Sequence, residues 1–271
     1  MYSSIRPSKL FRILLVAASV LSISTICAYA VPIKLDVGPL MEFLSSVIEP
    51  ETSGTAMAGV NITCSQFTEA IKKTQYARIL DVDKDDVDKL CMHFLKGAGR
   101  IPDITNREAA MALAQFMWES GGLLYKEEVN CKYGCPQYNS PGNPHSDVKP
   151  VPGKSYHGRG YIQLTHPDNY NSCSNSLYGD NRLLETPEQV ASDDQTAWDA
   201  SFWFWINRVR TDPDIIRGKF GASTMQINGM HECNNPAPEN LNKAKMRFKL
   251  YQQILSVFSP GEKAIEGGCY N

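Results

Sequence analysis

The hydrophobic pattern between residues 105 and 122 predicts a central helix. Four apolar positions recur at the i, i+3, i+4, i+7 spacing of a helix with one buried face: Ala110, Leu113, Ala114 and Met117. Thr105 and Glu108 have the spacing of a capping box at the start of this helix. Gly121 and Gly122 end it, because glycine readily adopts the left-handed conformation that a helix C-cap needs.

Further helical patterns lie on both sides of this segment. Two short ones precede it, at residues 67–71 and 87–94. A longer one follows near the end of the chain, with apolar residues on one face between Leu241 and Phe258. We also expect a helix to start at Thr186, with Pro187 at its first helical position.

The remaining patterns indicate little β-structure. Ser192 and Gln195 have capping-box spacing for another helix. Residues 132–156 are rich in Pro, Gly, Asn and Ser and predict a long loop. The end of the segment 156–165 alternates as a short strand would. The chain is therefore predicted to be mainly α, with at most a small β-sheet.

Glu119 lies in the last turn of the predicted central helix, directly after an apolar run that ends at Trp118. Burial disfavours a charged carboxylate and the negative end of the helix dipole repels it, so both effects favour the protonated acid. Glu127 and Glu128 follow across a two-glycine turn. An acid that faces a better solvated carboxylate is the arrangement of a glycosidase. A solvated face with adjacent glutamates is the alternative interpretation.

Composition and charge narrow the classes of function. The chain has 271 residues, 42% of them hydrophobic, which allows one large domain or two small ones with a real core. The net charge of −2 gives no electrostatic reason to expect nucleic acid or an anionic membrane as a partner.

The N-terminus predicts a secretory signal peptide over residues 1–30. Basic residues between Arg6 and Arg12 precede an apolar stretch, and Ala28-Tyr29-Ala30 is a small-residue cleavage site. A retained membrane anchor is the alternative. We expect residues 31–60 to form an arm or linker and residues 61–271 to form the main domain of a secreted protein.

Cysteine usage agrees with an oxidising compartment. Of eight cysteines, Cys27 would leave with the signal peptide, so at most three disulfides form and one thiol lacks a partner in the chain. No cysteine or histidine spacing supports a zinc site, and we expect neither a metal nor a cofactor. Asn61 begins an Asn-Ile-Thr triplet, which is an acceptor for N-glycosylation.

Several motifs, taken in order, resemble family 19 glycoside hydrolases, which include the chitinases of plants and bacteria and related phage endolysins. The stretch 118–122, Trp-Glu-Ser-Gly-Gly, is similar to the family segment that holds the general acid. The matching blocks that follow it are residues 125–128, 158–166 with 169–170, 183–187 with 203–205, and 227–233. The resemblance covers residues 62–269.

The resemblance implies a lysozyme-like, two-lobed helical domain with a substrate cleft. It also implies endo-acting hydrolysis, with inversion, of β-1,4-linked N-acetylglucosamine polymers, in which one carboxyl protonates the leaving oxygen and another activates water. Glu119 matches the general acid and Glu128 the general base. Glu127 is the alternative base if the register slips by one residue. Thr165 stands where the family has a hydroxyl that holds the attacking water.

Other positions match residues that surround the substrate in the family. Gln163, Asn169 and Asn228 match amides that line the sugar subsites. Tyr161 is a further candidate sugar contact, although aromatic residues at such spacing usually pack in a core. Arg247 matches an arginine of the final helix that approaches the catalytic carboxylates and would keep the base ionised.

The resemblance also implies a disulfide between Cys233 and Cys269, while the pairing of the other cysteines stays open. Three departures from the family pattern affect the expected substrate contacts. Trp118 replaces a histidine, Asp168 stands where plant enzymes carry a tyrosine, and Met230-His231 replaces Gly-Leu.

The expected partner is chitin or a chitooligosaccharide, bound by a monomer that has no nucleic-acid partner and no membrane contact after signal cleavage. Two alternatives remain. One is a muramidase-like endolysin that cleaves peptidoglycan, and the other is a non-catalytic chitin-binding protein built on the same fold.

Overall fold

The computed structural model describes residues 60–81, 84–131, 133–234 and 237–270. The predicted signal peptide and the predicted arm, except for Val60, lie outside these residues. The described helices are α3 (Cys64–Lys72), α4 (Lys84–Ala98), α5 (Asn106–Glu119), α6 (Pro167–Tyr178), α7 (Arg182–Glu185), α8 (Gln189–Ser192), α9 (Asp194–Phe204), α10 (Pro213–Ile216), α11 (Phe220–Glu232) and α12 (Pro238–Phe258). Short 3-10 turns at Ala77–Asp81, Val129–Cys131 and Pro136–Tyr138 and a π-helical turn at Trp205–Val209 complete the elements.

Helix α5 is the predicted central helix, and the prediction of its ends is confirmed. It runs from Asn106 to Glu119, and Gly121 and Gly122 both take positive φ angles just beyond it. The helix is more buried than its amphipathic pattern suggests, because every side chain from Glu108 to Met117 is buried. The other helices therefore cover it on all sides rather than on one face.

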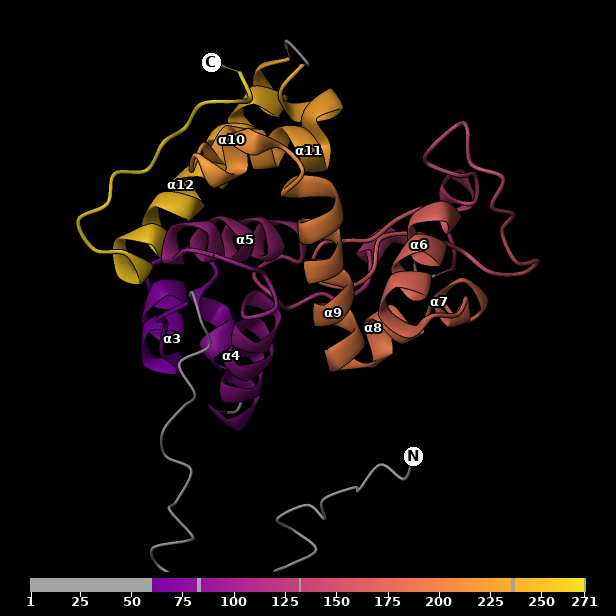
Figure 1. Cartoon of the computed structure of the whole chain (residues 1–271), viewed down its shortest axis with the longest axis horizontal. Coiled ribbons are helices and arrows are strands. Elements are labelled where there is room, and N and C mark those ends of the chain that lie inside the picture. Colours follow the sequence, from indigo (N-terminus) through magenta and orange to yellow (C-terminus); the bar gives the residue numbers. More distant parts are fainter. Residues whose placement is uncertain (1–59, 82–83, 132, 235–236, 271) are drawn as a thin grey trace, which may run out of the picture. The chain divides into compact units, whose positions relative to one another are not determined.

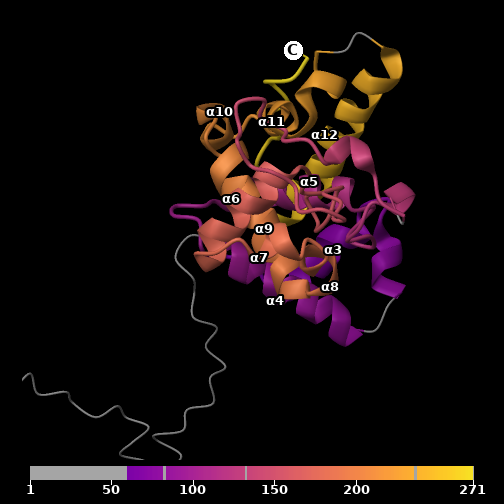
Figure 2. The same cartoon turned by 90° about the vertical axis from the view of Figure 1, so that its right-hand side faces the viewer.

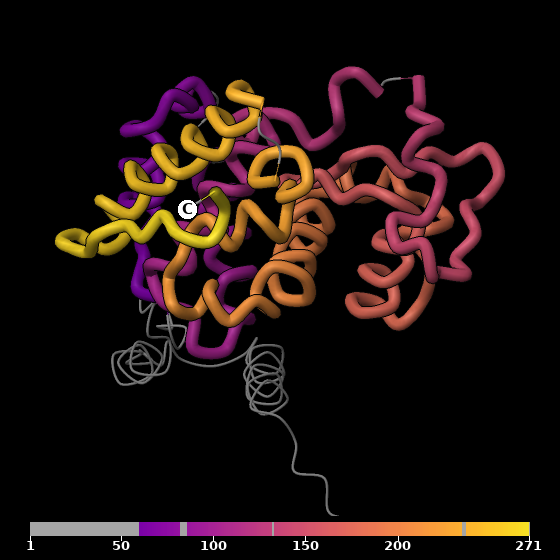
Figure 3. Tube along the Cα trace, turned by 90° about the horizontal axis from the view of Figure 1, so that it is seen from above, coloured from indigo at the N-terminus to yellow at the C-terminus, as the bar shows by residue number. Residues whose placement is uncertain are grey.

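The helices form two lobes. In one lobe α12 packs along α5 and also contacts α3 and α11. Figure 1 and the side view in Figure 2 both show α5 between α12 on one side and α3 with α4 on the other. The second lobe holds α6, α7 and the loop 133–156, and α9 runs beside it; the view from above separates the two groups of elements clearly (Figure 3).

The capping box at the start of α5 is only half formed. The Thr105 hydroxyl accepts a hydrogen bond from the Glu108 backbone N–H, as predicted. The Glu108 carboxylate does not return the bond, because it instead accepts from Trp205 Nε1 at 3.0 Å and Arg210 Nε at 2.8 Å. A buried carboxylate is stabilised more by a charged partner than by a second capping bond.

The helix start predicted at Thr186-Pro187 is wrong. Helix α7 ends at Glu185 with Thr186 as its C-cap, and Pro187 lies between α7 and α8. The next start is displaced by one residue, since Asp193 rather than Ser192 caps α9 and accepts from the Thr196 N–H at 2.7 Å. A carboxylate is a strong N-cap acceptor and competes well with a neighbouring serine.

The segment 156–165 is not a strand; the described residues form no sheet. Arg159 makes isolated antiparallel bridges with both Glu127 and Leu164. Gln163 and His166 have positive φ angles of 56° and 71°, which turn the chain before a ladder can extend. The alternating pattern reflects a tight turn whose apolar side chains reach the core.

Three disulfides are present, as the cysteine count allows. They join Cys64 to Cys91, Cys131 to Cys135, and the expected pair Cys233 to Cys269. Cys173 in α6 is buried and has no disulfide partner in the described part of the chain.

Candidate active site

A cavity of about 850 Å³ lies where the two lobes meet. Its walls come from the end of α5, the segments 138–143 and 158–169, the π-helical turn and the C-terminal half of α11. Glu119 and Glu128 both line this cavity. The two carboxyls predicted from the sequence therefore face one space.

Glu119 is the last residue of α5. The chain turns sharply after it: the Ser120 hydroxyl donates to the Phe116 carbonyl, and the Gly122 N–H bonds the Met117 carbonyl. A side chain at Gly122 would strike Tyr76, since an added Cβ would lie 2.5 Å from Tyr76 Cβ and 2.7 Å from the ring atom Cγ. The close packing of this turn fixes where α5 ends and so where Glu119 projects.

Arg247 is buried directly behind Glu119. Its side chain is 1% exposed, and Nη1 lies 2.5 Å from Glu119 Oε1. Arg247 was predicted to line the substrate site and to act on the base. The structure instead places it beneath the cavity wall, paired with the expected acid.

Glu232 is the second carboxylate on this guanidinium. Two parallel bonds of 2.8 Å join Arg247 Nε and Nη2 to the Glu232 oxygens, and Asn228 Nδ2 donates to Glu232 at 2.8 Å. Gln115 Oε1 accepts from Arg247 Nη1 at 2.8 Å. One guanidinium thus faces two carboxyls, Glu119 and Glu232.

Glu128 is held at the opposite side of the cavity. Its Oε1 accepts from Tyr138 Oη and its Oε2 from the Gly158 N–H, both at 3.2 Å. These two donors fix the position of the Glu128 carboxylate at the cavity wall.

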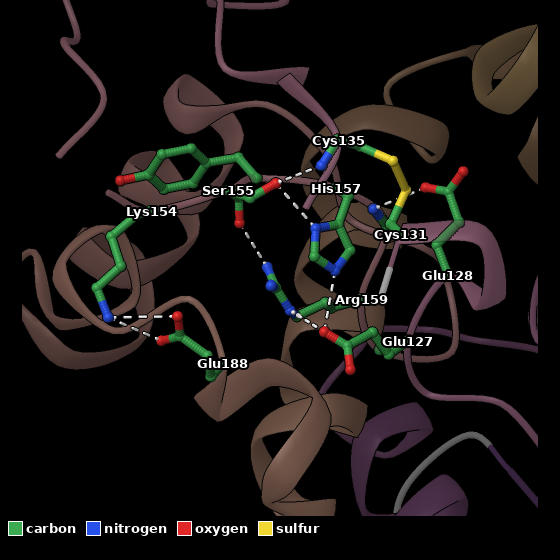
Figure 4. A network of polar contacts seen from close by, with 12 residues as sticks. Glu127, Glu128, Cys131, Cys135, Lys154, Ser155, His157, Arg159 and Glu188 are labelled. Atoms are coloured by element: carbon green, nitrogen blue, oxygen red, sulfur yellow. Dashed lines mark hydrogen bonds and ion pairs between the residues drawn. A yellow bond between two sulfur atoms is a disulfide. The ribbon is translucent and has the colours of Figure 1, made fainter. Parts of the chain in front are cut away.

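Glu127 points elsewhere. Its Oε1 accepts from His157 Nε2 at 2.9 Å and Arg159 Nε at 3.0 Å, and Figure 4 shows its carboxylate turned toward these two side chains. Partial burial opposes ionisation, but the hydrogen bonds from His157 and Arg159 outweigh it and lower the pKa of Glu127. Glu128, and not Glu127, therefore occupies the cavity wall.

The expected polar side chains of the substrate site are brought together. Those that line the cavity are Gln163, Thr165, Asn169 and Asn228. The Asn169 amide donates to the Thr165 carbonyl at 3.0 Å, which fixes the start of α6 against this wall.

Tyr161 is a correction to the predicted substrate site. It is 2% exposed, and its ring packs 4.2 Å from that of Trp198 in the core. Burial also raises its pKa well above the ordinary value, so the phenol stays neutral. Tyr161 packs beneath the turn 158–166 in the core, and its ring does not reach the cavity surface where a sugar would bind.

Asp168 gains a role that the sequence did not reveal. It lines the cavity, and its two oxygens accept from the backbone N–H groups of Gly142 at 2.7 Å and Asn143 at 3.0 Å. It therefore anchors the long loop to α6. The positions of Tyr138 and Glu232 were also missed, because hydrogen bonds between segments far apart in the sequence leave no periodic signal.

The described residues contain no group of three His, Cys, Asp or Glu side chains that could hold a metal ion. None of the described helices has both the length and the apolar character needed to cross a bilayer.

The chain is similar in sequence and in fold to known proteins. The family model described as Chitinase class I matches residues 103–219. An endochitinase of Arabidopsis thaliana is 39% identical over 151 residues, covering 52% of this chain and 51% of that protein. A basic endochitinase of Brassica napus is 36% identical over 161 residues, covering 57% and 55%. The chain thus spans about half the length of these curated relatives.

A crystal structure of a mutant of chitinase C has a TM-score of 0.56 and 25% identity, covering 78% of this chain and 97% of that one. The helical lobes and the cavity between them define a protein with the lysozyme-like fold. Over residues 103–219 the chain is similar to family 19 of the glycoside hydrolases.

Proposed function

We propose that the protein is an endo-acting chitinase that hydrolyses β-1,4-N-acetylglucosamine linkages with inversion. One observation carries this proposal: Glu119 and Glu128 line the same cavity but have opposite surroundings. Glu119 shares one buried guanidinium with a second carboxylate, whereas Glu128 accepts hydrogen bonds from two neutral donors, Tyr138 Oη and the Gly158 N–H. Different surroundings for two carboxyls are what separate an acid from a base.

In this reaction Glu119 donates its proton to the glycosidic oxygen as the bond to the anomeric carbon breaks. Glu128 removes a proton from a water that attacks the opposite face of the sugar, which requires carboxyls about 6.5–9.5 Å apart. The Thr165 hydroxyl, both donor and acceptor, orients that water. Gln163, Asn169 and Asn228 bind hydroxyl and acetamide groups of the chain.

The geometry of the Arg247 cluster supports the assignment of the acid. Glu232 holds the guanidinium through two parallel bonds, the stronger geometry for this pair. Glu119 makes the single contact and is 18% exposed to the cavity. It is therefore the carboxyl of the cluster that can exchange a proton with substrate.

Chitooligosaccharide hydrolysis tests the proposal. We expect new reducing ends with the α-anomer as the first product. Glu119→Gln keeps the shape of the side chain but cannot donate the proton, so kcat should fall about 10²- to 10⁴-fold with binding nearly intact. Glu128→Gln should also impair turnover. Glu69→Gln, on the exposed side of α3, is the matched control and should behave like wild type. A β-anomeric first product, or full activity in Glu119→Gln, would refute the mechanism.

One observation favours the peptidoglycan-cleaving alternative. Arg208 lines the cavity, stacks on the Trp203 ring at 5.4 Å, and has no acidic partner in the described part of the chain. A carboxylate on the substrate would pair with it, and chitin has none. Comparing turnover of glycol chitin with that of bacterial cell wall separates the two substrates. Substrate binding without any turnover would instead indicate a non-catalytic chitin-binding protein.

We also propose that the protein is secreted after removal of residues 1–30, works as a monomer and can carry a glycan on Asn61. The sequence patterns support this. Asn61 is exposed, so an attached glycan would meet no steric barrier at this side chain.

A further inference from the structure

Glu127 is anchored by two side chains that are far more buried than its own. His157 and Arg159 are each 4% exposed, whereas the Glu127 side chain is 48% exposed. The donors therefore cannot follow the carboxylate if it moves. Two fixed donors on one oxygen hold the Glu127 carboxylate in a single position. An ordinary surface ion pair does not do this, because both of its side chains are flexible.

His157 and Arg159 are themselves held in place by further hydrogen bonds. Arg159 Nη1 donates to the Ser155 carbonyl at 2.8 Å and to Tyr170 Oη at 3.2 Å. His157 Nδ1 lies 3.0 Å from Ser155 Oγ, which also accepts from the Cys135 N–H at 3.1 Å. Figure 4 shows this chain of contacts running from Cys135 through Ser155 and His157 to Glu127.

The same stretch of backbone carries Glu128. The Glu128 N–H bonds the Gly158 carbonyl at 3.0 Å, and the Gly160 N–H bonds the Lys126 carbonyl at 2.9 Å. Glu127 also forms an antiparallel bridge with Arg159. Successive side chains of an extended segment point to opposite faces. Holding Glu127 on one face therefore sets the direction of Glu128 on the other.

We infer that Glu127 is a positioning residue for Glu128, acting through His157 and Arg159. The inference rests on the proposed function, because Glu128 is there the base. Without the anchor the segment 126–128 can rotate about its axis, and the Glu128 carboxylate leaves Tyr138 and the Gly158 N–H. Misplacement of a catalytic group by about 1 Å can lower a rate about 10²-fold.

Two substitutions at one position separate positioning from catalysis. Glu127→Gln retains an oxygen that accepts from His157 and Arg159, so its kcat should stay within about threefold of wild type. Glu127→Ala removes that acceptor, so its kcat should fall about 10- to 100-fold. KM for chitohexaose should change less than twofold in both, because Gln163, Asn169 and Asn228 are untouched.

Glu188→Ala is the matched control. Glu188 pairs with Lys154 in the same region through a partly exposed ion pair, and Figure 4 draws no dashed contact from this pair to Glu127 or Glu128. Its kinetics should match wild type. Equal damage from Glu127→Gln and Glu127→Ala would make Glu127 itself the base and overturn the inference. A wild-type kcat in Glu127→Ala would overturn it as well. So would a fall in kcat accompanied by a changed KM and a lower melting temperature, because that pattern indicates general disruption of the fold.

A crystal structure of Glu127→Ala gives a readout that does not depend on activity. We expect the Glu128 carboxylate to have lost its contacts with Tyr138 Oη and the Gly158 N–H. If Glu128 keeps both contacts, the inference fails. If wild-type protein cleaves no chitin, the proposed function fails separately, and this structure still decides the positioning role.

Discussion

Among the single residues, Glu127 has a pKa whose shift follows from its contacts. Its pKa in the folded protein lies below the ordinary value of 4.5, since the hydrogen bonds from His157 and Arg159 outweigh the effect of partial burial. The folded state therefore binds fewer protons than the unfolded state in this range. The ion pair adds stability above about pH 4.5 and loses it as the pH falls through the folded-state pKa.

This gives a pH-dependent difference between wild type and Glu127→Gln. At pH 6 wild type should be the more stable, by less than about 1 kcal/mol because the carboxylate is half-exposed. Between pH 5 and 3 the two melting temperatures should converge. Differential scanning calorimetry at several pH values measures this, and a constant gap across that range would contradict it.

The residues that the sequence predicted well are those whose signal is local. Glu119 was located by an apolar run and a glycine turn that follow one another in the chain. Glu232 could not be located in this way, because its pairing with Arg247 joins α11 to α12 across 15 residues. The resemblance favoured Glu128 over Glu127 as the base but left a slip of one residue open, since adjacent residues differ only in the side to which they point.

At the scale of elements, the packing of α4 on α9 depends on a missing side chain. A Cβ on Gly97 would lie 2.0 Å from Phe202 Cδ2, well inside the contact distance. The Phe202 ring itself packs against Phe94 and Phe116, at centroid distances of 5.6 and 5.2 Å. It cannot move aside without disturbing both.

Gly97→Ala therefore sets two effects against each other. Helix propensity alone would stabilise α4 by about 1 kcal/mol. Overpacking costs about 1–3 kcal/mol, and more where a rigid ring must shift. We expect a net loss of stability in urea unfolding. Adding Phe202→Leu should recover part of it, and additive losses in this double-mutant cycle would disprove the contact.

The strand predicted for the second half of segment 156–165 and the misplaced helix start at Pro187 belong to this scale too. Both lie in the second lobe, where short elements and turns are stabilised by packing against one another. Periodicity reports which side chains are buried and not how the backbone makes its hydrogen bonds. The long helices α5 and α12 were recovered because their length gives the pattern several turns to repeat.

For the whole molecule, the C-terminal tail is tied back to the first lobe. The Phe220 and Gly221 N–H groups bond the carbonyls of Ile265 and Glu266, both at 2.9 Å, and the Cys233–Cys269 disulfide closes a separation of 36 residues. The tail therefore supports both ends of α11, the helix that carries Asn228 and Glu232.

Removing the Cys233–Cys269 disulfide should destabilise the protein more than removing the Cys131–Cys135 disulfide. In the chain-entropy account the longer loop contributes about 3–4 kcal/mol, and the loop of separation 4 contributes about 2 kcal/mol. Cys269→Ser should therefore lower the melting temperature more than Cys131→Ser. Comparable shifts, after free thiols are blocked, would show that loop length does not govern the difference.

Glu119 and Glu128 stand on one short stretch of chain, while the other walls of the cavity come from distant segments. Under the proposed function, mutations in those walls can therefore change which polymer binds without altering the spacing of the two carboxyls. The exposed residues Met230 and His231, at the cavity rim, are where we expect such changes to be tolerated best.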